Sequence, residues 1–193
     1  MPKAQPEPTP GAGDPLTENE GLLLALLARA GPLTAYQIAK AYDLSPVSNF
    51  NTSKGKIYPM IKRLQSSGLI RGEVVAGDRR GTERLTCTKE GLKKVKEWVV
   101  SVQPAHILPE DGLRSRVQSF GLLSKAERIS WLNDVREKMT EKLDALEKYK
   151  EITDTPFQEL VHQNAYSTIQ ARLSWLDRIF FALASDGPED RAT

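Results

Sequence analysis

The stretch SKGKIYPMIKRLQSSGLI, residues 53–70, decides how this sequence is interpreted. Its apolar residues recur at helical spacing, which predicts a helix with one side on a core. The apolar side holds Ile57, Met60, Ile61 and Leu64. The opposite side carries Gly55, Pro59, Lys62 and Ser66, flanked by Lys56, Tyr58 and Arg63. This outer side is basic and has little bulk at its start, so the backbone could lie close against another molecule.

Local signals place the ends of this helix and identify the elements around it. Ser53 is the expected N-cap, and Gly68 is suited to a left-handed C-cap. Capping boxes at 17–20 and 34–37 predict two earlier helices, over about 18–30 and 35–43. The segments LIRGEVVAG and ERLTCT alternate apolar and polar residues, which predicts two antiparallel strands joined by GDRRGT at 77–82. Thr88 can cap a fourth helix. Three helices followed by a hairpin with a charged tip are typical of a winged helix-turn-helix.

The charge of the chain is divided unevenly between its segments. Residues 34–98 contain thirteen Lys or Arg and six Asp or Glu, so this segment carries +7 while the remainder carries −5. A basic segment beside an acidic one favours contact with a polyanion. A chance cluster of solvated side chains is the alternative.

The expected polyanion is double-stranded DNA. A helix N-terminus binds phosphate, and the side chains of a recognition helix reach base edges in the major groove. Arginines on a narrow hairpin can enter the adjacent minor groove. The predicted DNA-binding residues are Thr34, Tyr36, Ser53, Lys54, Lys56, Tyr58, Lys62, Arg63, Arg79 and Arg80. Tyr36 could equally be a half-buried packing residue. Replacing Lys62 or Arg63 with alanine is expected to weaken operator binding with little change in melting temperature.

The rest of the chain has a different character. Residues 1–16 hold five of the twelve prolines and are interpreted as a disordered tail. After a winged helix-turn-helix domain at 17–102, residues 103–187 are predicted to form a helical dimerisation domain, and 188–193 a second tail. The dimerisation domain contains two long amphipathic helices, which are predicted to form an antiparallel hairpin. The second of these helices is expected to be capped by Thr155-Pro156-Phe157-Gln158. The fold class is mainly α with a small β-hairpin wing.

Two helices cannot bury both of their apolar sides on each other, so the leftover surface needs a partner, either the first domain or a second copy of the chain. The predicted dimerisation residues are Leu22, Leu26, Val161, Ala165, Ile169, Leu173, Trp175, Leu176 and Phe180. Trp131 and Trp175 could instead line a ligand pocket between subunits, although core packing is the more frequent role of tryptophan.

No pattern in the sequence supports catalysis, a cofactor or a metal. The two histidines, His106 and His162, are far apart and lack zinc-ligand spacing. The single cysteine, Cys87, favours a reducing, cytoplasmic location and is interpreted as a buried or edge thiol, with a redox sensor as the alternative. The leucine run at 22–27 is too short to span a bilayer and lacks a cationic leader, so it is interpreted as a buried helix.

With these motifs in view, residues 20–100 resemble the PadR family of bacterial transcriptional regulators. The resemblance is carried by GPLTAYQIAKAYD, by Ile57-Tyr58-Pro59 with Lys62-Arg63-Leu64 and Gly68-Leu69-Ile70, and by GDRRGTERLTCTKEG with LKKVKEWV. One departure is Gly81-Thr82-Glu83-Arg84, where the family commonly has a basic residue and two tyrosines. The resemblance implies a homodimer whose C-terminal helices pack on the partner's N-terminal helix. It also implies a repressor at an inverted-repeat operator, often released by a small-molecule effector.

A winged-helix module that binds an acidic protein partner, without specific DNA recognition, is the alternative function. Salt-sensitive binding to random duplex DNA distinguishes the two, since a pure interaction module should show little of it.

Overall fold

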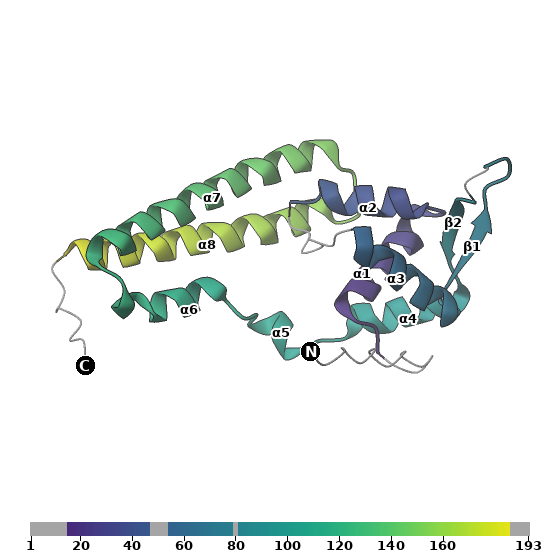
Figure 1. The fold of residues 1–193 in the computed structure, drawn as a ribbon, viewed down its shortest axis with the longest axis horizontal. Helices are drawn as coiled ribbons and strands as arrows, with labels where there is room; N and C mark the ends of the chain where they lie inside the picture. Colours follow the sequence, from purple (N-terminus) through teal and green to yellow (C-terminus); the bar gives the residue numbers. More distant parts are fainter. Residues whose placement is uncertain (1–14, 47–53, 79–80, 186–193) are drawn as a thin grey trace, which may run out of the picture. The chain divides into compact units, whose positions relative to one another are not determined.

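The described residues of this computed structural model, 15–46, 54–78 and 81–185, form mostly helices and one antiparallel hairpin (Figure 1). This architecture confirms the predicted fold class. The chain divides into two compact units, Met1–Gln103 and Pro104–Thr193, and each is described by itself. Within the described ranges, no helix has the length and apolar character needed to cross a bilayer.

Local capping sets the helices of the N-terminal unit. Its elements are α1 (Glu18–Ala30), α2 (Ala35–Leu44), α3 (Lys54–Ser66), β1 (Ile70–Val74), β2 (Glu83–Cys87) and α4 (Lys89–Val100). The predicted capping boxes are confirmed at Thr17 for α1 and at Thr34 for α2. The predicted cap of α4 is confirmed too, because the Thr88 hydroxyl accepts the backbone N–H of Gly91 at 3.0 Å.

The two strands form the predicted hairpin, with Ile70 opposite Cys87 and Val74 opposite Glu83. Leu85 of β2 also exchanges two backbone hydrogen bonds with Leu33, at 3.1 and 2.8 Å, which ties the hairpin to the segment between α1 and α2. Gly68 adopts the predicted left-handed conformation, with φ of +71°. Helix α3 therefore ends sharply, and the chain enters β1 two residues after Gly68.

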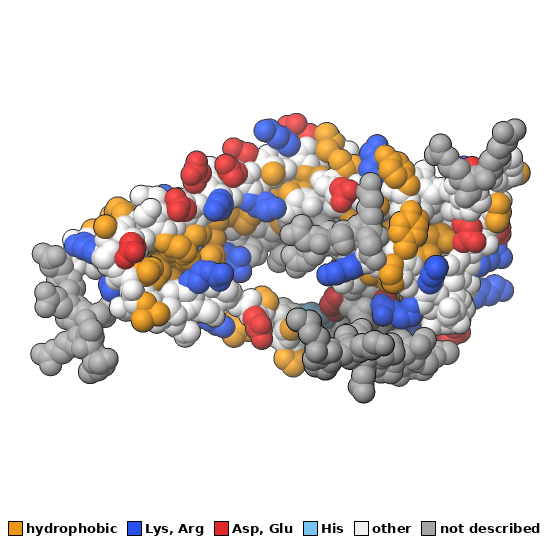
Figure 2. All heavy atoms as spheres, in the orientation of Figure 1, with side chains coloured by type: hydrophobic (Ala, Val, Ile, Leu, Met, Phe, Trp, Pro, Cys, Tyr) orange, Lys and Arg blue, Asp and Glu red, His pale blue; other side chains and the backbone are white. Residues whose placement is uncertain are grey.

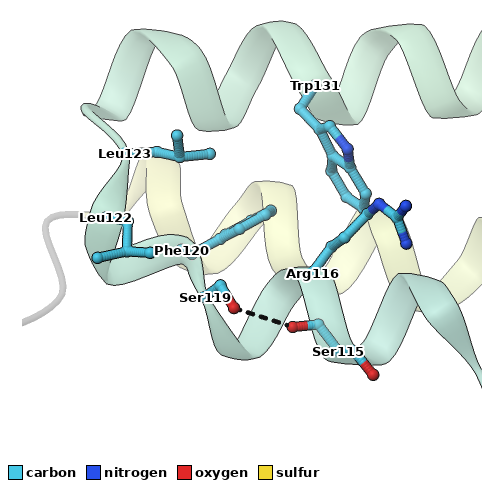
Figure 3. Close-up of a pocket in the computed structure, with 7 residues that line it drawn as sticks. All are labelled: Ser115, Arg116, Ser119, Phe120, Leu122, Leu123 and Trp131. Atoms are coloured by element: carbon cyan, nitrogen blue, oxygen red, sulfur yellow. Dashed lines mark hydrogen bonds between the residues drawn. The ribbon is translucent and has the colours of Figure 1, made fainter. Parts of the chain in front are cut away.

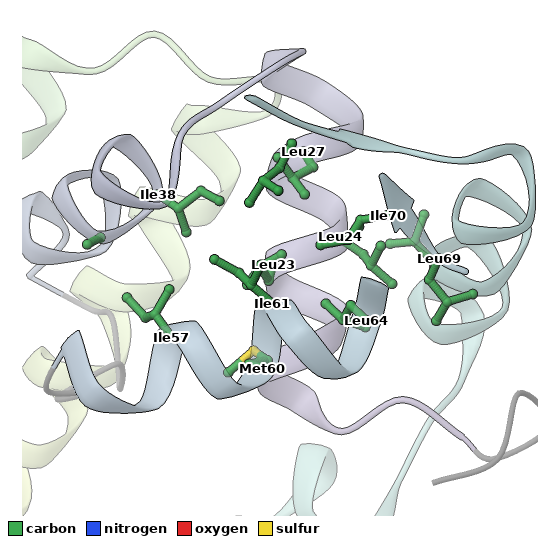
Figure 4. Packing of buried hydrophobic residues seen from close by; sticks show 13 residues of the cluster. Leu23, Leu24, Leu27, Ile38, Ile57, Met60, Ile61, Leu64, Leu69 and Ile70 are labelled. Carbon is green, nitrogen blue, oxygen red and sulfur yellow. The ribbon is translucent and has the colours of Figure 1, made fainter. Parts of the chain in front are cut away.

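The core of this unit lies between α1, α2, α3 and the start of the hairpin (Figure 4). The predicted apolar side of α3 packs there on the leucines of α1 and on Ile38 of α2. Each of these α3 side chains is at most 5% exposed, and they are Ile57, Met60, Ile61 and Leu64. Pro59 lies inside α3 on its exposed side, so the helix keeps its apolar side on the core without interruption.

The C-terminal unit contains α5 (Pro104–Ile107), α6 (Gly112–Gln118), the 3₁₀ turn η1 (Phe120–Leu122), α7 (Lys125–Ile152) and α8 (Gln158–Ala184). The long helices α7 and α8 form the predicted hairpin (Figure 1). Its core holds Phe120, Leu132, Met139 and Leu176. Helix α6 was not predicted: its cap, Asp111, accepts the N–H of Leu113 at 2.9 Å, but its seven residues are too few to show a periodic pattern.

The predicted start of the last helix is wrong by two to three residues. Phe157, expected inside the first turn, has left-handed φ and ψ of +60° and +23° and precedes α8. Half of the expected capping box survives, because the Thr155 N–H donates to Gln158 Oε1 at 3.1 Å. A left-handed residue cannot continue a right-handed helix, so α8 begins at Gln158.

Candidate nucleic-acid interface

The outer side of α3 is the centre of the predicted DNA-binding surface. Lys56 and Lys62 are exposed, and Tyr58 is 55% exposed although it is aromatic. Lys54 is the first residue of α3. Figure 2 shows basic side chains spread over the side of this unit in view. Three predicted contacts, Ser53, Arg79 and Arg80, lie outside the described residues. An exposed tyrosine between lysines on a helix packed by its other side can meet both phosphates and bases.

The start of α2 offers a second group of donors. Thr34 Oγ1 accepts the N–H of Gln37 at 3.2 Å, and Gln37 Oε1 accepts the N–H of Thr34 at 2.9 Å. The Thr34 side chain is therefore used to cap the helix. Tyr36, the second residue of α2, is 65% exposed, so it is not the half-buried packing residue considered as the alternative. Its phenol is free to approach a phosphate at the positive end of α2.

The hairpin is joined to the end of α3 by a side-chain contact that sequence reasoning missed. Gln65 Nε2 donates to Glu83 Oε2 at 2.9 Å. Gly72 on β1 leaves the space for this contact, since a Cβ there would lie 2.3 Å from Glu83 Oε2. Glu83, one of the residues that depart from the pattern of the resembled family, therefore links the hairpin to α3.

Arg63 is held by an acidic residue of α1. Its Nε lies 2.7 Å from Oε1 of Glu20, whose side chain is only 6% exposed, while the Arg63 side chain is 34% exposed. The contact is an ion pair rather than an aligned hydrogen bond, because the N–H is not directed at the oxygen. The sequence places Glu20 only as a capping residue. Its role toward α3 depends on α1 and α3 meeting, which no local pattern reveals.

This ion pair corrects one expectation for Arg63→Ala. Removing the guanidinium would leave the Glu20 carboxylate buried without its cation, and an unpaired buried charge is strongly destabilising. The melting temperature should therefore fall, contrary to the expectation from sequence. The same expectation for Lys62 stands, because its side chain is exposed.

The predicted dimerisation residues are placed unevenly. Leu22 and Val161 are 42% and 58% exposed, as an unpartnered contact requires. Most others are half-buried, namely Leu26, Ala165, Ile169, Leu173, Trp175 and Phe180. Leu176 is a correction: it is fully buried in the core of its own unit, so it packs inside the subunit and not on its surface. The heptad-like spacing alone could not tell which apolar residues point inward between α6, α7 and α8.

A groove of about 510 Å³ in the C-terminal unit is a second candidate site (Figure 3). Trp131 meets Phe120 edge-on, with ring centroids 5.3 Å apart. Arg116 lies beside Trp131 in Figure 3 and donates from Nη1 to the Gly112 carbonyl at 2.8 Å. The remaining lining residues are Ser115, Ser119, Leu122 and Leu123. Trp175, the other predicted pocket residue, packs against the core of this unit instead.

Two sequence predictions concern chemistry: that no metal site is present, and that Cys87 is a buried or edge thiol. Within the described residues, no cluster of His, Cys, Asp or Glu could hold a metal ion. Burial raises the pKa of the Cys87 thiol, which keeps it protonated and weakly nucleophilic at neutral pH. This environment suits a packing thiol better than a redox sensor.

Helices α1 to α3 and the hairpin after them define a winged helix-turn-helix, the class of fold that places one helix in a DNA groove. Residues 23–97 match the model of the transcriptional regulator PadR-like family, which confirms the resemblance drawn from the sequence. That family consists of transcriptional regulators rather than enzymes. None of the curated proteins compared with the chain gave a match.

Solved structures extend the likeness beyond this unit. Bacillus subtilis PadR in complex with operator DNA has a TM-score of 0.72 and 23% identity, covering 86% of this chain and 99% of that one. The same protein in complex with p-coumaric acid has a TM-score of 0.67 and 23% identity, covering 86% and 96%. The PadR-like regulator BC1756 from Bacillus cereus has a TM-score of 0.68 and 20% identity, covering 90% and 99%. The chain therefore shares their fold, C-terminal helices included.

Proposed function

We propose that this protein is a homodimeric, sequence-specific DNA-binding regulator that acts as a cytoplasmic repressor at an inverted-repeat operator. The observation that carries the proposal is the exposed, basic outer side of α3 on a winged helix-turn-helix unit, with Tyr58 between Lys56 and Lys62. The start of α2, with exposed Tyr36, adds a phosphate-binding helix N-terminus. The complex of the Bacillus subtilis relative with operator DNA supports the same ligand.

The dimer follows from the kind of site proposed. Two recognition helices on one two-fold axis would meet successive major grooves about 34 Å apart, which requires an operator with matching symmetry. Exposed apolar residues on α1 and α8, including Leu22 and Val161, supply surface for the second copy. A basic interaction module with an acidic protein partner would need no such symmetry.

The decisive experiment selects bound fragments from genomic DNA and reads the recovered sites. Sites with two-fold symmetry are expected. If the recovered fragments share no common sequence, the protein does not recognise a specific site. If it shows no salt-sensitive binding to random duplex DNA at low salt, the protein-interaction module is the better-supported function.

Lys62→Ala is expected to weaken binding to a recovered site and to reduce the slope of log affinity against log salt by about 0.9, the contribution of one neutralised phosphate. The melting temperature should stay near that of the unaltered protein, because Lys62 is exposed. Lys148→Ala, an exposed lysine on α7, is the matched control. If the two variants have equal DNA affinities and equal salt slopes, α3 does not contact the DNA.

We also propose that the groove at Trp131 binds the effector that releases the operator. An aromatic wall with a guanidinium beside it suits a planar ligand that carries an acid group. The Bacillus subtilis relative was solved with p-coumaric acid, a ligand of this chemistry.

Addition of p-coumarate is therefore expected to lower the DNA affinity of the unaltered protein. Arg116→Ala should remove the effect of the ligand while DNA binding without ligand stays unchanged. Arg114→Ala, an exposed arginine on the same helix, controls for loss of charge. If both variants respond to p-coumarate equally, Arg116 does not hold the ligand.

A further inference from the structure

Glu20 is a charged side chain that is almost completely buried, which is rare unless its charge is matched. The two oxygens of its carboxylate make different contacts. Oε2 accepts the backbone N–H of Thr17 at 2.9 Å and the Thr17 hydroxyl at 2.8 Å, while Oε1 faces Arg63 at 2.7 Å. The capping contacts fix the carboxylate at the start of α1, so it cannot follow Arg63 if that side chain moves. Arg63 is therefore anchored to a rigid point.

The anchor leaves most of the guanidinium unused. The ion pair is made through Nε, and an arginine carries four further N–H donors on its terminal nitrogens. Among the described residues, the guanidinium of Arg63 has no other ion-pair or hydrogen-bond partner. The side chain remains one-third exposed, on the flank of α3 between its core side and its outer side. The Nε edge of the guanidinium is held inside the protein, and the terminal nitrogens can reach an anion.

We propose that Glu20 is a positioning residue for DNA binding, which holds Arg63 by its Nε so that the terminal nitrogens meet a phosphate at the edge of the groove. This inference rests on the proposed function and adds a residue to it. Arginine can serve both partners at once because its donors are spread over a planar fork, whereas a lysine ammonium is a single point charge. Anchoring also reduces the ordering that DNA would otherwise impose on a long side chain.

Two substitutions separate anchoring from general structural support. Glu20→Gln keeps a capping-box side chain but removes the negative charge. We expect affinity for a recovered DNA site to fall by about two- to tenfold, the cost of ordering one long side chain on binding. The salt slope should stay the same, since Arg63 still neutralises its phosphate. Glu18→Gln, an exposed glutamate in the same turn, removes the same charge and should not lower affinity.

Arg63→Lys is the second variant and keeps the positive charge. The lysine can pair with Glu20, so the melting temperature should stay well above that of Arg63→Ala. It then has no second donor group for DNA, so its affinity should fall to the level of Arg63→Ala and its salt slope should drop by about 0.9. A merely structural arginine would instead be rescued by lysine in both measurements.

The outcomes are distinct. If Arg63→Lys binds DNA with unaltered affinity and slope, or if Glu20→Gln binds as tightly as Glu18→Gln, the positioning role is overturned while the proposed function stands. If the unaltered protein shows no salt-sensitive binding to DNA, the proposed function fails and the role of Glu20 falls with it. Arg63→Lys retains the ion pair with Glu20, so this variant still tests the proposal if Glu20→Gln fails to fold.

Discussion

Leu176→Ala is expected to lower the free energy of unfolding by about 2–5 kcal/mol, the range for truncating a fully buried leucine. The side chain has no exposed surface and lies in the core formed with Phe120, Leu132 and Met139. Alanine would leave a cavity between α7, α8 and η1 that the surrounding helices can close only in part. Denaturant unfolding followed by circular dichroism measures the loss.

The dependence of the unfolding transition on protein concentration distinguishes a core residue from an interface residue. A contact between subunits stabilises the fold only at concentrations at which the dimer is populated, whereas a cavity inside one subunit destabilises the fold equally at all concentrations. Leu176→Ala should therefore shift the transition by the same amount in dilute and concentrated samples. Val161→Ala, on the exposed side of the same helix, is the control and should shift it only in concentrated samples, in which the dimer is populated. A shift for Leu176→Ala confined to concentrated samples would return this residue to the dimer contact predicted from sequence.

Gly91→Ala is expected to destabilise the N-terminal unit by about 1–3 kcal/mol, the usual cost of forcing atoms into a packed site. A Cβ at this position would lie 2.1 Å from the carbonyl oxygen of Leu69 and 2.8 Å from the sulfur of Cys87. The same carbonyl accepts the backbone N–H of Thr88 at 3.0 Å, so it is fixed where the hairpin meets α4. Backbone cannot swing aside as a flexible side chain can.

Thermal unfolding of Gly91→Ala should therefore begin at a lower temperature, and the wing should lose its fixed angle to α3. Gly121→Ala is the control, since a Cβ there would meet nothing within 4 Å. Its melting temperature should be close to that of the unaltered protein. Equal melting of the two variants would mean that α4 does not approach β1 this closely.

Much of the fold follows from patterns along single elements. The capping boxes at Thr17 and Thr34 both form as predicted, because a cap depends only on residues three apart. The core side of α3 and the left-handed Gly68 were predicted for the same reason. Failures occur where a pattern is short or a neighbour intervenes, as in α6, whose few residues gain their stability by packing on the long helices.

The candidate site, like the fold, could be predicted from the sequence only in part. The exposed side of α3, with Lys56, Tyr58 and Lys62, could be read from helical spacing and from charge. The partners of Arg63 and Glu83 could not, since Glu20 is 43 residues from Arg63 and Gln65 is 18 residues from Glu83. Neither pair has a spacing that indicates contact, and both form only because the elements that carry them pack on a shared core.

From its sequence alone, this protein was determined to be a mainly helical chain with a basic winged segment, because periodicity, caps and charge act over one or two turns. Only the tertiary structure decided that Leu176 is enclosed within its own subunit and that Arg63 is held by a buried carboxylate. The physical reason is that burial and ion pairing depend on which surfaces meet, and an amphipathic helix specifies that it has an apolar side without specifying what covers it.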